Sequence, residues 1–248
     1  RSFSITVQND APSNHFNTVL YTGNDGTQSI TGLNFQPDFT WIKQRSGGAS
    51  HSLQDSVRGV GQSKNIYSDN TAVEGTYGQY GYLSAFGTNG FTVVKNSGSH
   101  TNAGSSTYVA WNFKAGGAAV ANTDGTINSD ISVNNTLGFS IVSYTGDGSS
   151  GNVGHGLNAT PELIIAKNLD GTNSWVVRVN SLGNGYLVLN STSTYSTTSL
   201  WGNPTNSVFN FTHPANGQTL NNRYIAYCFT SKPGFSKVGS YTGNGSAS

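Results

Sequence analysis

Apolar and polar residues alternate in short runs along this chain, and residues that favour turns separate the runs. In residues 108–113, Tyr, Ala and Asn alternate with Val, Trp and Phe, which is the period of two expected of a β-strand. Turn sequences containing glycine recur, for example at residues 87–90, 123–125 and 183–185. Frequent turns without a long amphipathic helical stripe predict an all-β protein with little helix.

Several sequence blocks occur twice and in the same order. The matched blocks are 16–24 (FNTVLYTGN) with 139–147 (FSIVSYTGD), 32–33 with 156–157, 37–43 (PDFTWIK) with 161–167 (PELIIAK), and 107–113 (TYVAWNF) with 223–229 (RYIAYCF). Such ordered recurrence indicates two related units. We expect two tandem β-sandwich-like units of lectin-like or jelly-roll type, in which the strands at 108–113 and 224–229 occupy equivalent places.

The repeats also suggest boundaries. The expected divisions are an N-terminal strand or connector at 1–15, a first β repeat unit at 16–116, a linker and entry strand at 117–138, a second β repeat unit at 139–232, and the start of a third repeat or a closing strand at 233–248. The last division rests on residues 235–244, which copy the opening strand of each unit. The small residues of 115–122 fit either a flexible hinge or a tight crossing. Because the chain opens on Arg1, we expect a mature product or a piece of a longer chain.

Charge is scarce and balanced in this sequence. Only 9% of the 248 residues are charged, and 12 Lys and Arg oppose 11 Asp and Glu. This balance argues against strong electrostatic binding to nucleic acid or to an anionic membrane. No apolar run is long enough to insert into a membrane. The single cysteine, Cys228, allows no disulfide within the chain, and its apolar surroundings predict a buried thiol.

Candidate catalytic chemistry is sparse. Hydrolysis of a polysaccharide normally needs two carboxylates, one with a raised pKa. Glu162 is expected to be a strand-entry carboxylate and Glu74 a loop charge. The five histidines lack the spacing of a metal site. We therefore predict no catalytic residue, no metal and no cofactor. Asp55 and Arg58, three positions apart, are expected to form a local ion pair or to orient a ligand.

Carbohydrate binding demands less, because the apolar faces of sugars stack on aromatic rings while amides and hydroxyls bond to the sugar oxygens. We expect Trp41 and Trp111, which lie within apolar strands, to be core residues. The candidates for a glycan-binding surface are Trp201 in a polar loop, the glycine-spaced Tyr77, Tyr80 and Tyr82, Trp175, and His155 between two glycines. Each also has a purely structural alternative: core packing for the two tryptophans, a loop packed on its own sheet for the tyrosines, and an ordinary turn histidine for His155.

Several of these stretches resemble a known repeat. Residues 139–148 (FSIVSYTGDG), 153–157, 161–167 and 55–60, together with the closing 234–246, are similar to a repeat domain of tail-fibre and other virion-surface proteins of marine bacteriophages. The resemblance covers most of the chain. It implies a place on the virion surface, outside cells, and a role in host-surface attachment or virion architecture. It supplies no catalytic or binding residues.

The sequence thus favours a non-enzymatic, tail-fibre-like module for attachment to host-surface glycan or for fibre architecture. Its expected partners are a host cell-surface glycan and other virion proteins or copies of itself, without nucleic acid or membrane insertion. Two alternatives remain open. A polysaccharide depolymerase would place two carboxylates about 5–10 Å apart in a groove. A purely structural capsid or filament subunit would show extensive self-contacts.

Overall fold

The computed structural model describes residues 11–212 and 219–245. These residues form antiparallel β-sheets, as the sequence predicts. Their helical segments are single 3₁₀ turns: η1 (Pro12–Asn14), η2 (Gln62–Lys64), η3 (Gly78–Tyr80) and η4 (Asn180–Leu182). Frequent turns and the shortage of helix-favouring residues account for this all-β outcome.

The first unit contains one large and one small sheet. The large sheet has the order β1 (Phe16–Thr22), β8 (Thr107–Phe113), β3 (Phe39–Gln44), β4 (Ser52–Asp55), β5 (Ile66–Tyr67). The small sheet has the order β2 (Thr27–Thr31), β7 (Gly90–Val94), β6 (Tyr82–Gly87). The small sheet packs on one face of the large sheet, which we call its outer face, through a core that includes Ile42, Phe91 and Tyr108.

The second unit repeats this arrangement. Its large sheet has the order β15 (Leu187–Val188), β14 (Val176–Val179), β13 (Leu163–Asn168), β17 (Arg223–Phe229), β11 (Phe139–Thr145), β10 (Ser129–Asn134), β9 (Val120–Asn122). A two-stranded sheet of β12 (Gly151–Gly154) and β16 (Val208–Phe211) covers the outer face. The core between them includes Val142, Tyr144 and Trp201.

The strand registers of the two units correspond. Phe113 of β8 lies opposite Phe16 and Phe39, and Phe229 of β17 lies opposite Phe139 and Leu163. The strands at 108–113 and 224–229 therefore occupy equivalent places, as the repeated blocks predict. One difference lies at the sheet edge. In the second unit β10 and β9 continue the sheet beyond β11, whereas within the described residues β1 has no such neighbour.

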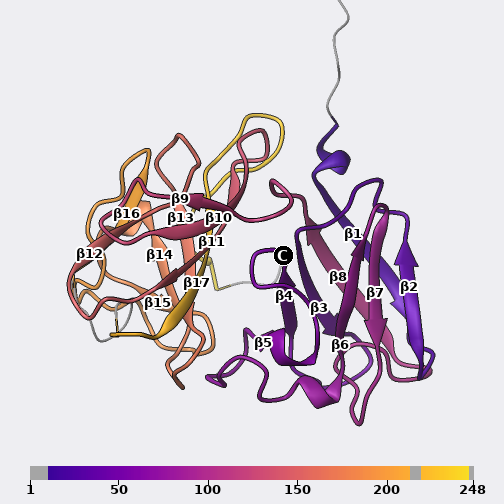
Figure 1. The fold of residues 1–248 in the computed structure, drawn as a ribbon. Coiled ribbons are helices and arrows are strands. Elements are labelled where there is room, and N and C mark those ends of the chain that lie inside the picture. Colours follow the sequence, from indigo (N-terminus) through magenta and orange to yellow (C-terminus); the bar gives the residue numbers. More distant parts are fainter. Residues whose placement is uncertain (1–10, 213–218, 246–248) are drawn as a thin grey trace, which may run out of the picture.

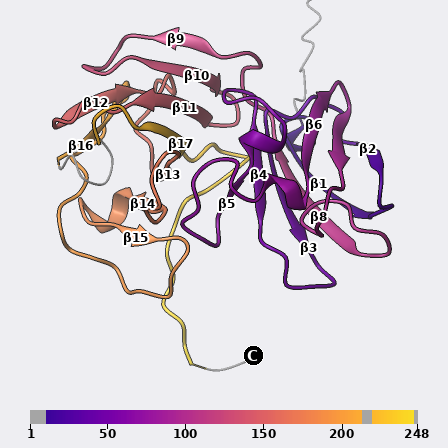
Figure 2. The ribbon, with the colours of Figure 1, turned by 60° about the horizontal axis from the view of Figure 1, so that its bottom comes forward.

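The inner faces of the two large sheets, opposite the small sheets, share a third core. Phe39 of the first unit packs on Tyr227 of the second, with ring centroids 4.4 Å apart, and Phe113 packs on Phe139 at 5.2 Å. Figures 1 and 2 show β4 and β5 turned toward the second unit and β2 far from it. Leu53 of β4 and Ile66 of β5 belong to the shared core, whereas Leu20 of β1 is 60% exposed, so the contact is offset toward the β3–β5 side of the first large sheet.

The segment that joins the units crosses tightly. The carboxylate of Asp38 accepts hydrogen bonds from the backbone N–H groups of Ala115 (2.7 Å) and Gly117 (3.3 Å). The hydroxyls of Ser56 and Ser132 both donate to the carbonyl of Gly117. Of the two readings that the small residues allowed, the structure therefore has the fixed crossing.

The described residues near the C-terminus do not join either large sheet. Residues 1–10, most of the expected N-terminal strand or connector, lie outside the described residues. In the described part of 233–248, residues 233–245 form no ladder with either large sheet and make only an isolated bridge between Lys232 and Ser236. The closing strand onto the second unit is thus not formed, while Phe235 packs at the edge of the shared core.

Candidate functional site

A cluster of aromatic rings lies in the loops that follow β5. Tyr77 and Tyr80 are stacked with their ring centroids 6.0 Å apart, and their exposed fractions are 38% and 37%. Behind them, the buried ring of Tyr67 contacts Tyr77, and His100 contacts both Tyr67 and Tyr80 edge-on. The two outer tyrosines are therefore supported from beneath and present ring surface to solvent.

The backbone of this loop depends on its glycines. Gly78, which begins η3, lies so close to the carbonyl of Gln62 that a side chain would collide with it. Gly81 has a φ of +126°, which strains other residues. The sequence singled out these glycines as spacers, and their conformations place Tyr77 and Tyr80 on the surface. Tyr82 differs from its neighbours because it is half-buried in β6.

A surface hollow of about 410 Å³ adjoins Tyr77 at the seam between the units. Hydroxyl, amide and small apolar groups line it, and none of the lining side chains carries a charge: Ser50, Asn70, Thr71, Ala72, Val73, Thr76, Tyr77 and Thr172. Thr172 comes from the second unit. A ring face beside uncharged hydrogen-bonding groups suits a neutral polyhydroxylated ligand.

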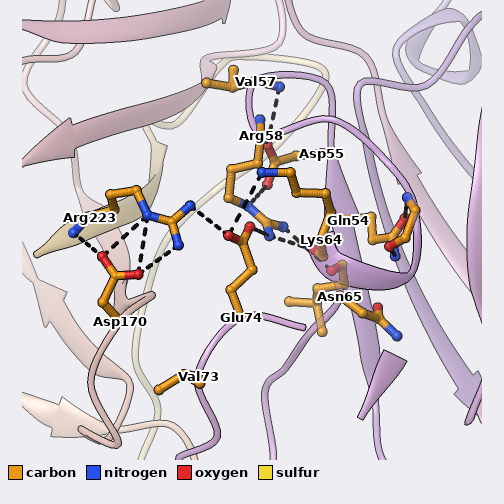
Figure 3. Close-up of polar contacts among 12 residues, drawn as sticks. Gln54, Asp55, Val57, Arg58, Lys64, Asn65, Val73, Glu74, Asp170 and Arg223 are labelled. Carbon is orange, nitrogen blue, oxygen red and sulfur yellow. Dashed lines mark hydrogen bonds and ion pairs between the residues drawn. The ribbon is translucent and has the colours of Figure 1, made fainter. Parts of the chain in front are cut away.

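An ion-pair network lies close to this hollow and joins the two units (Figure 3). Arg58 bonds through Nε to the Asp55 carboxylate at 2.7 Å and through Nη1 to Glu74 at 2.9 Å. Glu74 also pairs with Arg223 of β17 at 2.8 Å, and Arg223 pairs with Asp170 at 2.6 Å. Charges from both repeats thus neutralise one another across the seam.

Two of these residues were candidates for orienting a ligand, and the structure corrects that expectation. The Asp55 and Arg58 side chains are 0% and 3% exposed, so they reach no solvent. Tyr227 of the second unit donates a hydrogen bond to Asp55 at 2.8 Å. Burial lowers the pKa of Arg58, but Asp55, Tyr227 and Glu74 outweigh it and raise that pKa overall. The local ion pair is confirmed, and its role is to hold the units together.

Trp175, a candidate for sugar stacking, is instead buried in the shared core. Its indole N–H donates to the carbonyl of Tyr67 across the seam at 2.7 Å. A ring with no exposed surface cannot stack on a sugar. Trp175 therefore belongs to the contact between the units.

Trp201, the favoured candidate for a loop platform, is also fully buried. It stacks on Phe211 at a centroid distance of 4.4 Å and contacts Phe209. Within the described residues its indole N–H has no hydrogen-bond partner. The polar sequence around it left a loop platform open beside core packing, and the structure has the core packing, because the loop folds inward over the second unit's own core.

His155, whose flanking glycines could have exposed its ring to a ligand, is buried as well. Its Nδ1 accepts a hydrogen bond from the backbone N–H of Leu157 at 3.1 Å, and its Nε2 lies 3.3 Å from the carbonyl of Thr205. These partners fit the neutral ring with its proton on Nε2. Burial lowers the pKa of His155 to about 4.

The carboxylates weighed for hydrolysis have structural partners. Glu162 accepts hydrogen bonds from the backbone and hydroxyl of Ser231. Its repeat equivalent, Asp38, binds the backbone after β8 in the same way. Glu74, expected to be a loop charge, also pairs with Arg223 of the second unit, a link that the sequence does not predict. A signal existed, because each charge in a chain with 9% charged residues is uncommon.

A second, partly exposed aromatic group lies on the inner face of the first large sheet. Trp41 and Trp111 are only half-buried, contrary to the expected core positions, and line a hollow of about 290 Å³ with Phe16, His51 and Phe113. Their rings meet edge-on at 6.2 Å, and the Trp41 indole N–H donates to His51 at 2.8 Å. The two apolar sets in β8 were the available signal, but they did not reveal which set stays uncovered.

In the described segments no helix has the length and apolar character needed to cross a bilayer. The same residues contain no group of three His, Cys, Asp or Glu side chains placed to hold a metal ion. Cys228 is buried, as predicted, and burial raises the pKa of its thiol.

Comparison with known proteins places the chain in a family. Neither a search of curated proteins nor a search of solved structures gives a match. A family model described as a domain of unknown function, DUF7483, matches residues 11–248, and the chain therefore belongs to the DUF7483 family.

Proposed function

We propose that this chain is a non-enzymatic module of a virion surface, of tail-fibre type, which attaches to a neutral glycan on the host surface. The observation that carries the proposal is the stacked, exposed pair Tyr77 and Tyr80 beside an uncharged hollow. Tyrosine offers rigid ring area together with a polar tip, which suits a sugar. In this proposal each unit is a small sandwich of lectin-like or jelly-roll type.

The location of the hollow supports attachment. Residues from both units line it, and the ion-pair network close by fixes their relative position. A site on such a seam is preorganised, so little conformational entropy is lost when a ligand binds. Both glutamates, Glu74 and Glu162, are engaged in structural contacts, which favours binding over hydrolysis.

A glycan-array screen with the purified chain tests the proposal. We expect retention of neutral or weakly charged glycans, and a loss of about tenfold or more in affinity when Tyr77→Ala and Tyr80→Ala are combined. Tyr241→Ala is the matched control, because that ring is 95% exposed and lies outside the cluster. Melting temperatures of all variants separate loss of binding from loss of folding.

The salt dependence of binding is a second measurement. With so little charge at the site, affinity should change less than about threefold between low and physiological ionic strength. The proposal fails if no glycan is retained, or if the double tyrosine variant binds as well as the Tyr241→Ala control. A steep loss of affinity with salt would point to an acidic ligand instead.

A further inference from the structure

The inner face of the first large sheet is only partly covered. Its β3–β5 side packs on the second unit through Phe39, Leu53 and Ile66. Its β1–β8 side extends beyond this contact and carries half-buried aromatic residues and the exposed Leu20. We call the side chains of Phe16, Leu20, Trp41, Val109 and Trp111 the open face.

Strand register places these side chains together. Leu20 lies opposite Val109 in the β1–β8 ladder, and Trp111 lies opposite Trp41 in the β8–β3 ladder. Residues directly opposite in antiparallel strands point to the same face. Phe16, Trp41 and Trp111 together line the hollow of about 290 Å³. The open face is therefore a mainly apolar surface, in which the exposed Thr18, opposite Trp111, lies between Phe16 and Leu20.

The second unit indicates what covers such a face. The positions equivalent to Phe16 and Trp111 are Phe139 and Tyr227, and both are buried in the shared core, whereas Trp41 and its equivalent Ile165 both pack against its edge. What covers them is the inner face of the first unit. In this fold, inner faces pack on inner faces, with aromatic rings in direct contact across the join.

We propose that the open face is an interface with a second copy of this chain, which contributes its own open face. When the same surface of two identical chains forms both sides of an interface, the contact has two-fold symmetry. The open face is continuous with the existing inner-face contact, because Phe113 and Trp41 adjoin both. Two such mainly apolar surfaces lose little hydration of polar groups when they bury one another.

Charge does not oppose this pairing. Lys43, which lies opposite Val109, donates from its ammonium group to the carbonyl of Ala49 at 2.5 Å, and Asp69 accepts a hydrogen bond from the backbone N–H of His51 at 3.2 Å. His51 uses its Nδ1 to accept the Trp41 indole N–H, and burial lowers the pKa of His51, so its ring stays neutral near pH 7. Two copies therefore meet without repulsion between buried charges.

Sedimentation velocity of the chain over a range of concentrations tests the proposal. We expect a monomer–dimer equilibrium whose dissociation constant rises about tenfold or more in Leu20→Asp and in Trp111→Ser. Leu220→Asp is a matched control, because Leu20 and Leu220 are each 60% exposed but Leu220 lies in the second unit, away from the open face. We expect the control to associate as the unmodified chain does.

Cross-linking supplies a measurement that does not rely on a destabilised interface. Leu20→Cys should give a dimer with a short bismaleimide, whereas Leu220→Cys should not, and the buried Cys228 adds little background. A chain that stays monomeric to hundreds of micromolar overturns the proposal and leaves the open face to a different partner. Equal weakening by Leu20→Asp and Leu220→Asp, or equal cross-linking of both cysteine variants, also overturns it.

Discussion

The two units share a strand order but differ in how their inner faces are covered. In the second unit the central inner-face residues, Phe139 and Tyr227, are fully buried beneath the first unit. In the first unit Phe16 and Trp111, at the equivalent positions, remain half-exposed. Duplication thus preserved the sheet while an offset contact gave one copy a covered face and the other an open one. The difference shows that surface character here depends on the partner sheet as much as on the local sequence.

We expect the largest loss of stability at the contact between the two units when the Arg58 side chain is replaced. Arg58→Met leaves the buried Asp55 and Glu74 carboxylates without their shared cation, and we expect a loss of about 3–5 kcal/mol in the free energy of unfolding. Urea unfolding, followed by tryptophan fluorescence, measures the loss.

The matched variant of that experiment is Arg223→Met. Arg223 pairs with the same Glu74, but its side chain is 46% exposed, so we expect a loss of about 1 kcal/mol or less. Equal losses in the two variants would contradict the distinction between a buried and a solvent-screened member of the network.

Acid should weaken the second unit through His155. The unfolded chain takes up a proton near pH 6.5, whereas the folded histidine, with a pKa of about 4, does not. His155 therefore has no effect on the free energy of unfolding above about pH 6.5. As the pH falls from 6.5 toward 4, that free energy decreases, by about 3 kcal/mol in total. The difference in unfolding free energy between the native chain and His155→Gln, measured from pH 7 to 4, isolates this contribution. An unchanged pH dependence in the variant would refute the assignment.

A smaller difference in stability is expected between a substitution in the shared core and one in the second unit's own core. Trp175→Phe removes a buried hydrogen bond to Tyr67, whereas Trp201→Phe removes an indole N–H without a partner among the described residues. Both variants lose similar volume. We expect Trp175→Phe to be the more destabilising by about 1 kcal/mol in urea unfolding. The reverse order would contradict the placement of the two rings.

The repeated blocks were sufficient to predict the strands and their equivalence, because repeated hydrophobic patterns specify local structure and pairing. They did not show that Trp41 and Trp111, expected in the core, stay only half-buried, and they left both core packing and a loop platform open for Trp201, which is buried. Whether Trp41 is covered depends on the offset between two sheets, and whether Trp201 is buried depends on the path of a long loop. Both are contacts between distant residues, and no local pattern encodes them. The same reason explains why the link between Glu74 and Arg223 was missed.

The candidate glycan-binding residues show the same difference between local sequence signals and contacts with distant residues. Tyr77 and Tyr80 were identified from glycines next to aromatic residues, a local signal of a surface loop, and the structure exposes them. His155 also lay between glycines, yet the ring folds back to bond with Leu157 and Thr205. Flanking glycines allow a side chain to point either to solvent or into the core, so its contacts with distant residues determine which orientation it adopts.

In each unit the last strand of the large sheet pairs with a strand from early in that unit, and this has a consequence for synthesis on the ribosome. β1 pairs with β8, and β11 with β17, so neither large sheet can close until its last strand has emerged. The inner face of the first unit, including Phe39, then stays exposed to solvent until β17 has been synthesised and Tyr227 can pack on it. Such late, non-local pairing is slow and leaves apolar surface free to associate wrongly. The period of greatest risk for this protein therefore lies between the emergence of Phe113 and that of Phe229, before the molecule is complete.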